Sequence, residues 1–228
     1  MGEKYFSKQT FDFLSELTDN NDRAWFEANK KRYEDFVRTP ALDFIEAMSH
    51  HMPAISRHFL AQPKKVGGSL MRVYRDTRFS GDKTPYKTNI GIQFRHEIGK
   101  DVHAPGYYLH IEPHQCFFAA GVWHPDADAL FRIRTFMVEK SEKWQPVLQD
   151  KAFNKFFALD GDSLSRVPRG FAKEHPLAED LKRKDFICLA ALGRKEVVSG
   201  NLLELAVERY RQAAPLMKFL CDALELRF

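Results

Sequence analysis

The chain has 228 residues, of which 44% are hydrophobic and 29% are charged. These proportions are ordinary for a folded globular protein, and the 12 Gly and 11 Pro exclude a collagen-like or low-complexity chain. A net charge of +4 is too small to require a large polyanionic partner.

Nothing in the sequence indicates a membrane partner or a cofactor. No apolar run approaches the roughly 20 residues needed to span a bilayer, and the first residues lack the apolar segment of a secretory signal. The cysteines (Cys116, Cys188 and Cys221) are odd in number and widely separated, as expected of reduced thiols. No P-loop or dinucleotide-binding glycine pattern is present. We therefore expect a cytoplasmic protein without a cofactor.

Residues 1–60 predict helices. Ser7 can cap a first helix, and the polar cluster at residues 19–22 ends it and can cap a second one. Thr39 and Pro40 are typical of a further helix start. Apolar residues follow at helical spacing over residues 45–59, although Pro53 should kink or split that helix.

The apolar period changes to two in residues 68–124, which predicts a sheet. Two of the expected strands are joined by His114 and Gln115, a connection short enough for a hairpin. Within the strands, Ile90, Ile92 and Phe94 should share one face, as should Tyr107, Leu109 and Ile111. The four short segments are residues 70–75, 88–95, 106–113 and 116–123, and the simplest arrangement is a mainly antiparallel meander.

Residues 125–228 predict a mixed but mainly helical region. A helix should start at Asp126, short helices should follow around residues 141–158, and residues 186–192 suit another strand. From Asn201 onwards the apolar spacing predicts a terminal helix that Pro215 should divide or kink. The sequence therefore predicts one α+β domain over residues 1–228, in which helices at both ends flank a mainly antiparallel sheet of four to five strands.

Residues 72–89, called the basic loop below, depart from the pattern around them. The segment is polar and much longer than a strand connection requires, and loops of this kind usually serve a function. Two acids, Asp76 and Asp82, stand against five basic residues, which are Arg72, Arg75, Arg78, Lys83 and Lys87. Guanidinium and ammonium groups suit phosphate and carboxylate oxygens, so the basic loop predicts an anion-binding site.

We expect further residues to take part in this site. The hydroxyl of Tyr86 can donate to a ligand, and Arg134 on the helix after residue 126 can reach the same region. If the protein is an enzyme, Asp76, Asp82 and Tyr86 are the catalytic candidates within the segment. The alternative is structural: the two acids pair with two arginines, and the network only holds the loop.

Two other patterns carry less weight. His110, Glu112 and His114 alternate and could ligate a metal ion, but Pro113 and the hairpin disturb the third position, so we expect no metal. Ser80 and Lys83 match a Ser-x-x-Lys spacing, but the glycine and proline around them oppose the helix that this nucleophile needs.

The chain resembles family 2461 of the domains of unknown function over nearly its whole length, from about Phe11 to Leu220. Residues 75–89 match the family pattern most specifically. The other matching pieces follow in the same order and are residues 11–17, 20–26, 106–110, 121–123 and 168–171, with Tyr33, Pro40, Pro125 and Arg134. The resemblance implies the α+β fold and brings no established activity to these residues.

Three functions remain open from the sequence. The first is a pocket for a phosphate-bearing or otherwise anionic small ligand, with or without chemistry on it. The second is a nucleic-acid or protein-binding module, for which affinity falls steeply with salt. The mild net charge favours the small ligand over nucleic acid. The third is a salt-bridged loop in a scaffold that binds its partner elsewhere.

Overall fold

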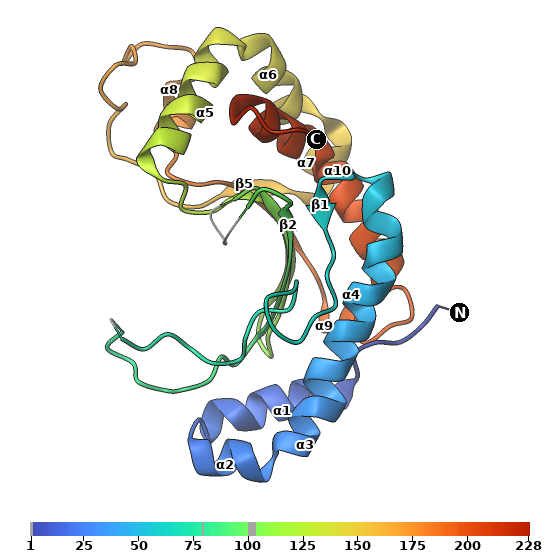
Figure 1. Cartoon of the computed structure of the whole chain (residues 1–228). Coiled ribbons are helices and arrows are strands. Elements are labelled where there is room, and N and C mark those ends of the chain that lie inside the picture. The colour runs from blue at the N-terminus through green and yellow to red at the C-terminus, as the bar shows by residue number, and fades with distance from the viewer. Residues whose placement is uncertain (1, 79, 100–103) are drawn as a thin grey trace.

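The computed structural model describes residues 2–78, 80–99 and 104–228 (Figure 1). The N-terminal part is helical, as predicted. A π-helical turn precedes the longest of its helices, and a 3₁₀ turn follows that helix. These elements are α1 (Lys8–Asp19), α2 (Arg23–Ala28), α3 (Lys30–Tyr33), η1 (Glu34–Arg38), α4 (Thr39–His51) and η2 (Met52–Ala54).

The second half contains the remaining helices around the sheet. They are α5 (Ala127–Glu139), α6 (Ser141–Gln149), α7 (Lys151–Phe156), α8 (Ala178–Leu181), α9 (Arg194–Val197) and α10 (Leu202–Ala223). Asp126 caps α5 by accepting from the Ala129 N–H at 2.8 Å, which confirms the predicted helix start. The short helices predicted around residues 141–158 are α6 and α7.

The strands form one antiparallel sheet in the order β1-β2-β3-β4-β6-β5. They are β1 (Phe59–Leu60), β2 (Ile90–His96), β3 (Gly106–Ile111), β4 (Cys116–Val122), β5 (Ala158–Asp160) and β6 (Phe186–Ala191). The α+β class and the antiparallel sheet are confirmed, and β2, β3 and β4 are the expected meander. The sheet has six strands because the short strands β1 and β5 pair at its two edges.

One face of the sheet forms the core. Ile92 pairs with Leu109, and both are fully buried together with Phe94 and Tyr107, as their alternation predicted. Burial of such side chains stabilises the fold by about 1.5–3 kcal/mol each. Helices α4 and α10 lie on this side of the sheet in Figure 1, and Tyr210 of α10 contacts Tyr107 at a ring-centroid distance of 4.9 Å.

The opposite face of the sheet is only partly buried. Gln93, Tyr108, His110, Phe117 and Leu189 alternate with the core residues along their strands, and all five have intermediate exposure. No helix covers this face in Figure 1 as far as the chain is described. Its polar and aromatic side chains are therefore less buried than those of the core face.

The predicted strand over residues 70–75 is wrong. Leu70 forms a single bridge with Ile92, whereas Tyr74 forms a single bridge with Tyr86. The segment changes partner between these two bridges, so it cannot build a continuous ladder on either side. It runs as an extended connection that leads from the sheet edge into the basic loop.

The predicted interruption of the helix occurs at Pro53, whereas the predicted division at Pro215 does not. The apolar stripe over residues 45–59 does not stay helical, because α4 ends at His51 and Phe59 instead pairs with His96 in the sheet. In contrast, α10 continues through Pro215 as one helix. Packing on both sides of Pro215 explains this, since Ala213 and Leu216 are completely buried and offset the single backbone hydrogen bond that proline lacks.

Candidate functional site

The basic loop folds back on itself. The N–H of Arg75 donates to the carbonyl oxygen of Pro85 at 2.9 Å, and the N–H of Lys87 donates to that of Val73 at 2.7 Å. These two bonds hold the beginning and the end of the loop side by side. The basic residues near its two ends are thereby brought into one region, although they are far apart along the chain.

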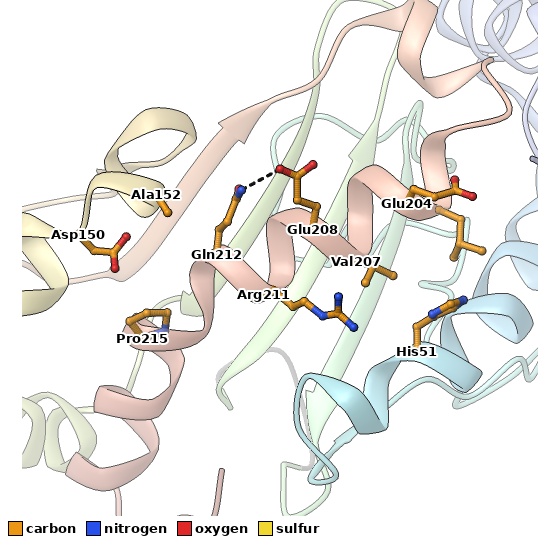
Figure 2. A pocket seen from close by; sticks show the side chains of 10 residues that line it. His51, Asp150, Ala152, Glu204, Val207, Glu208, Arg211, Gln212 and Pro215 are labelled. Atoms are coloured by element: carbon orange, nitrogen blue, oxygen red, sulfur yellow. Dashed lines mark hydrogen bonds between the residues drawn. The ribbon is translucent and has the colours of Figure 1, made fainter.

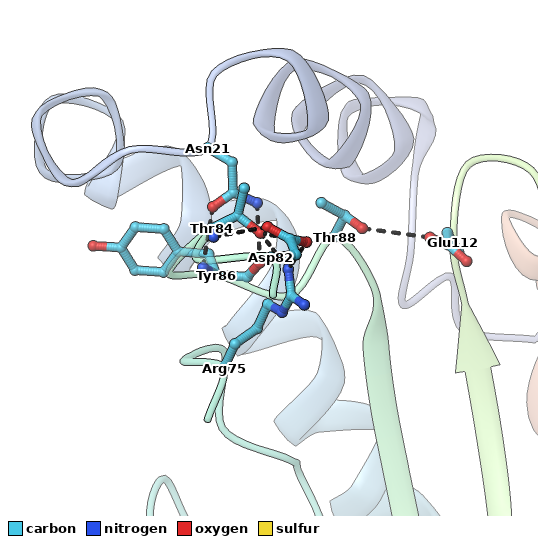
Figure 3. A network of polar contacts seen from close by, with 7 residues as sticks. All are labelled: Asn21, Arg75, Asp82, Thr84, Tyr86, Thr88 and Glu112. Carbon is cyan, nitrogen blue, oxygen red and sulfur yellow. Dashed lines mark hydrogen bonds and ion pairs between the residues drawn. The ribbon is translucent and has the colours of Figure 1, made fainter. Parts of the chain in front are cut away.

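Asn21, in the connection between α1 and α2, attaches the loop to the N-terminal helices. Its side-chain amide donates to the Tyr86 carbonyl oxygen at 3.0 Å and accepts from the Tyr86 N–H at 3.0 Å (Figure 3). The amide thus satisfies both backbone groups of Tyr86, as a neighbouring strand would. The ring of Tyr86 stacks on Phe26 of α2 with centroids 4.0 Å apart.

Two arginines of the loop are paired with its two acids. Arg75 donates to the Asp82 carboxylate and to the Thr84 hydroxyl. Arg78 donates to Asp76 through Nε at 3.0 Å and Nη2 at 2.7 Å. The hydrogen bonds from the arginines lower the pKa of Asp76 and of Asp82 to about 2. Both carboxyl groups are therefore ionised at neutral pH, and each is already hydrogen-bonded to an arginine of the loop.

The other three cations of the loop differ in their surroundings. The Lys83 ammonium donates to the Thr77 carbonyl oxygen at 2.8 Å, while Arg72 is exposed to solvent. Lys87 is partly buried, and burial together with the positive charge of Arg72 lowers its pKa. No acid of the described residues forms an ion pair with Lys87.

A cavity of about 310 Å³ lies between the basic loop and α1. Its walls are formed by polar side chains and by the backbone of the loop. The lining residues are Thr18, Asn21, Arg75, Asp82, Thr84, Tyr86, Lys87, Thr88 and Asn89. We call this space the loop cavity.

Lys87 also borders a second, narrower space whose walls are apolar. Phe13, Leu14 and Leu17 of α1 contribute to it. A lysine between an apolar and a polar space keeps its methylene groups against the former and its ammonium in the latter. This position accounts for the loss of hydration that lowers the pKa of Lys87.

The candidate residues from the sequence are thus only partly brought together. Arg75, Asp82, Tyr86 and Lys87 line the loop cavity, whereas Arg72, Arg78, Lys83 and Asp76 do not appear in its walls. The phenol ring of Tyr86 points away from Arg75 and Asp82 in Figure 3, so its hydroxyl group does not face them.

Arg134 does not line the loop cavity. Arg134 lies on α5, its residue is only 7% exposed, and its Nη2 donates to the carbonyl oxygen of Arg183 at 2.7 Å. Helix α5 packs at the end of the sheet away from the N-terminal helices in Figure 1. The helical position of Arg134 was correct, but the packing of α5 directs it to another part of the molecule.

Sequence reasoning missed the uncharged walls of the loop cavity. Thr18 and Asn21 lie far before the loop in the chain, with Asn21 65 residues before Tyr86, and Thr88 and Asn89 were assigned to a strand. The polar cluster at residues 19–22 signals a helix end, but nothing in it indicates that one amide reaches Tyr86. Such a contact follows from the tertiary packing alone.

Two other groups of polar residues lie outside the loop cavity. His110 and Glu112 face each other, while His114 is exposed in the hairpin turn, and the described residues hold no group of three metal ligands. A larger cavity of about 590 Å³ lies along α10, between His51 and Asp150 (Figure 2). Its charged residues, among them Glu204, Glu208 and Arg211, are of mixed sign, and Glu208 accepts from the Gln212 amide at 3.0 Å.

Comparison with known proteins places the chain in a family. In the part of the chain that is described, no helix has both the length and the apolar character to cross a membrane. No curated protein and no solved structure gives a significant match. A family model described as "Conserved hypothetical protein (DUF2461)" matches residues 9–219. Since this match covers nearly the whole chain, the protein belongs to that family.

Proposed function

We propose that the protein binds a phosphate-bearing or other anionic small ligand in the loop cavity. The observation that carries this proposal is the position of Lys87, a partly buried ammonium at a polar cavity that forms no ion pair with an acid in the described part of the chain. A charge removed from water needs a partner of opposite sign, and an anion in the cavity supplies one. Binding then restores to Lys87 the interactions that burial has removed.

The balance of charge in the loop supports an anion rather than a cation. Asp82 is the acid in the cavity wall, and its pairing with Arg75 offsets its charge. Lys87 remains in excess, and the exposed Arg72 adds positive potential close enough to lower the pKa of Lys87. Thr88 and Asn89 add a hydroxyl and an amide that can donate to ligand oxygens.

The volume of the loop cavity, and the presence of one cation without an ion pair among the described residues that line it, favour a small ligand. A cavity of about 310 Å³ lies at the lower end of the range for small-molecule sites, which is about 300–1,000 Å³. A nucleic-acid surface needs several cations to contact successive phosphates. Arg75 and Arg78 are instead engaged by the loop's own acids. We therefore favour a small anionic ligand over a nucleic-acid partner.

The test is the thermal stabilisation of the protein by inorganic phosphate. At about ten times its Kd, a ligand that binds only the folded state stabilises it by about 1.4 kcal/mol, which raises the melting temperature by about 3 to 6 °C. We expect this rise in the natural protein and its loss in Lys87→Ala. The melting temperature without phosphate should fall only slightly, because Lys87 loses the contacts of its methylene groups but no ion pair to a described acid.

Lys83→Ala is the matched control, since Lys83 is a lysine of the same loop that does not line the cavity. It should keep the response to phosphate. An equal loss in both variants, or no stabilisation of the natural protein, would contradict the proposal. A strong destabilisation of Lys87→Ala without phosphate would instead indicate the structural role. Affinity that falls steeply with salt would favour nucleic acid.

A further inference from the structure

The walls of the loop cavity are polar throughout. Every described residue that lines it carries a hydroxyl, amide, carboxylate or charged nitrogen group, and none of them is aliphatic. Most small-molecule sites are instead lined predominantly by apolar and aromatic side chains. A ligand that fills this cavity must therefore offer polar groups along its whole length, and not only at its anionic end.

Tyr86 is the aromatic residue among the described lining residues, and its ring is not available to a ligand. The residue is only 3% exposed. Its ring stacks on Phe26 with centroids 4.0 Å apart, and the ring of Tyr74 lies 5.4 Å from it. A nucleobase needs a free aromatic face on which to stack. The described walls of the cavity offer no such face, which disfavours a nucleotide.

The apolar space on the other side of Lys87 is too small to receive part of a ligand. Its volume is about 10 Å³, compared with about 310 Å³ for the loop cavity. A single water molecule already needs about 10–15 Å³. An alkyl chain attached to the anion therefore has no room between Lys87 and the apolar face of α1. The ligand stays within the polar space.

Asp82 supplies a hydrogen-bond acceptor in the cavity wall. Its Oδ2 accepts from Arg75 and from the Thr84 hydroxyl, and its Oδ1 accepts from the Thr84 N–H at 2.9 Å (Figure 3). The two oxygens of a carboxylate have about four acceptor positions, so these contacts leave one position on Oδ1. The side chain is 56% exposed, which makes this position accessible to a small molecule.

Thr18 of α1 adds a second acceptor. Its hydroxyl donates to the Leu14 carbonyl oxygen at 3.0 Å, so its proton is engaged while its oxygen can still accept. A fully ionised phosphate group only accepts hydrogen bonds and gains nothing from Asp82 and Thr18. A hydroxyl group donates, and it suits both. Lys87 suits the anion, because an ammonium group only donates and this one has no ion pair to a described acid.

We propose that the ligand of the loop cavity is a polyol phosphate, such as a phosphorylated sugar. Its phosphate group contacts the ammonium of Lys87, and its hydroxyl groups donate to Asp82 and Thr18. Thr88 and Asn89 of the same wall can donate to other phosphate oxygens. This inference rests on the proposed function and deepens it, since Lys87 must first hold an anion. A site built around hydroxyl groups discriminates against an analogue without them, because its acceptors then stay without partners.

The experiment compares two phosphate monoesters by isothermal titration calorimetry with the whole chain. Glycerol phosphate, esterified at a terminal carbon, and n-propyl phosphate have the same carbon chain and the same charged group, but only the first carries free hydroxyl groups. We expect glycerol phosphate to bind at least about tenfold more tightly, because hydrogen bonds to a charged group contribute that much. Inorganic phosphate is measured alongside both esters.

Asp82→Asn tests the acceptor directly. The amide keeps the shape of the carboxylate but removes its negative charge. We expect the preference for glycerol phosphate to fall below about threefold, while inorganic phosphate binds at least as tightly as before. Asp76→Asn is the matched control, because Asp76 is also paired with an arginine of the loop but does not line the cavity. It should keep the tenfold preference, and melting curves should show that both variants remain folded.

Equal affinities of the natural protein for the two esters would overturn the inference, and so would tighter binding of adenosine monophosphate than of ribose phosphate. An equal preference in Asp82→Asn and Asp76→Asn would also contradict it, because the hydroxyl groups would then not donate to Asp82. If inorganic phosphate still binds in a way that depends on Lys87, the proposed function survives these outcomes. Absence of inorganic phosphate binding by the natural protein would contradict both.

Discussion

The central sheet and the basic loop are both held in place by hydrogen bonds, but of different kinds. Strands β2, β3 and β4 pair along six consecutive residues at each junction. In the described part of the loop a single β-bridge joins Tyr74 and Tyr86, and the amide of Asn21 and the loop's own ion pairs fix it further. The sheet's stability is shared over many equivalent bonds, whereas the loop depends on a few specific side chains.

This difference predicts that replacing a glycine by alanine lowers the free energy of unfolding strongly in the sheet and hardly at all in the loop. Gly121 of β4 has φ +136°, and a Cβ atom there would lie 2.0 Å from the Phe186 carbonyl oxygen. Gly121→Ala should therefore lower the free energy of unfolding by about 3 kcal/mol or more, through backbone strain and a clash inside the sheet. Urea unfolding followed by circular dichroism measures this loss.

Gly81 of the basic loop provides the comparison. A Cβ atom at Gly81 would meet nothing within 4 Å. Gly81→Ala should change the free energy of unfolding by less than about 0.5 kcal/mol. Equal effects of the two substitutions would show that the loop is packed as tightly as the sheet, against this account.

The second prediction concerns Asn21, which ties the loop to the helices. Asn21→Ala leaves the N–H and carbonyl of Tyr86 without their partner and should lower the free energy of unfolding by about 1–2 kcal/mol. Limited proteolysis should then cut within residues 72–89 sooner than in the natural protein.

Asn20→Ala serves as its control, because the Asn20 amide donates only to the carbonyl of Glu16 within the same helix end. This variant should leave the cleavage rate of the loop unchanged. Faster cleavage in both variants would assign the effect to the end of α1 rather than to the loop.

The third and smallest effect concerns pH. The hydrogen bond from Arg75 lowers the pKa of Asp82 from 3.8 to about 2. The stabilisation from this pair is complete above the unfolded pKa and is lost as the pH falls from about 3.8 towards 2. A ¹³C NMR titration of the carboxyl group should give a midpoint near 2, and Arg75→Ala should move it upwards. A midpoint at the ordinary value in the natural protein would mean that the pair is absent in solution.

The sequence predicts the structure of the sheet much better than that of the loop. Alternation places Ile92, Phe94 and Leu109 in the core because each strand repeats one local rule. The pairing of Arg75 with Asp82 follows from the fold-back of residues 72–89, which has no such repeat. Composition alone indicated that acids and bases would meet there, but it did not show that Lys87 is the cation that lines the cavity without an ion pair to a described acid.

Contacts between residues that lie far apart in the sequence are predicted least well. Arg134 was assigned to a helix correctly, yet its side chain reaches the carbonyl of Arg183 rather than the loop. The contact of Asn21 with Tyr86 spans 65 residues of sequence and leaves no periodic signal. Both depend on how whole helices pack, which local spacing does not determine.

The most direct test of the account is to map inorganic phosphate on the ¹⁵N-labelled protein by NMR. The account predicts saturable shifts of the amide signals of Thr88, Asn89 and the neighbouring Lys87, which disappear in Lys87→Ala and persist in Lys83→Ala. Shifts confined to the cavity along α10, or no saturable shift at all, would contradict it.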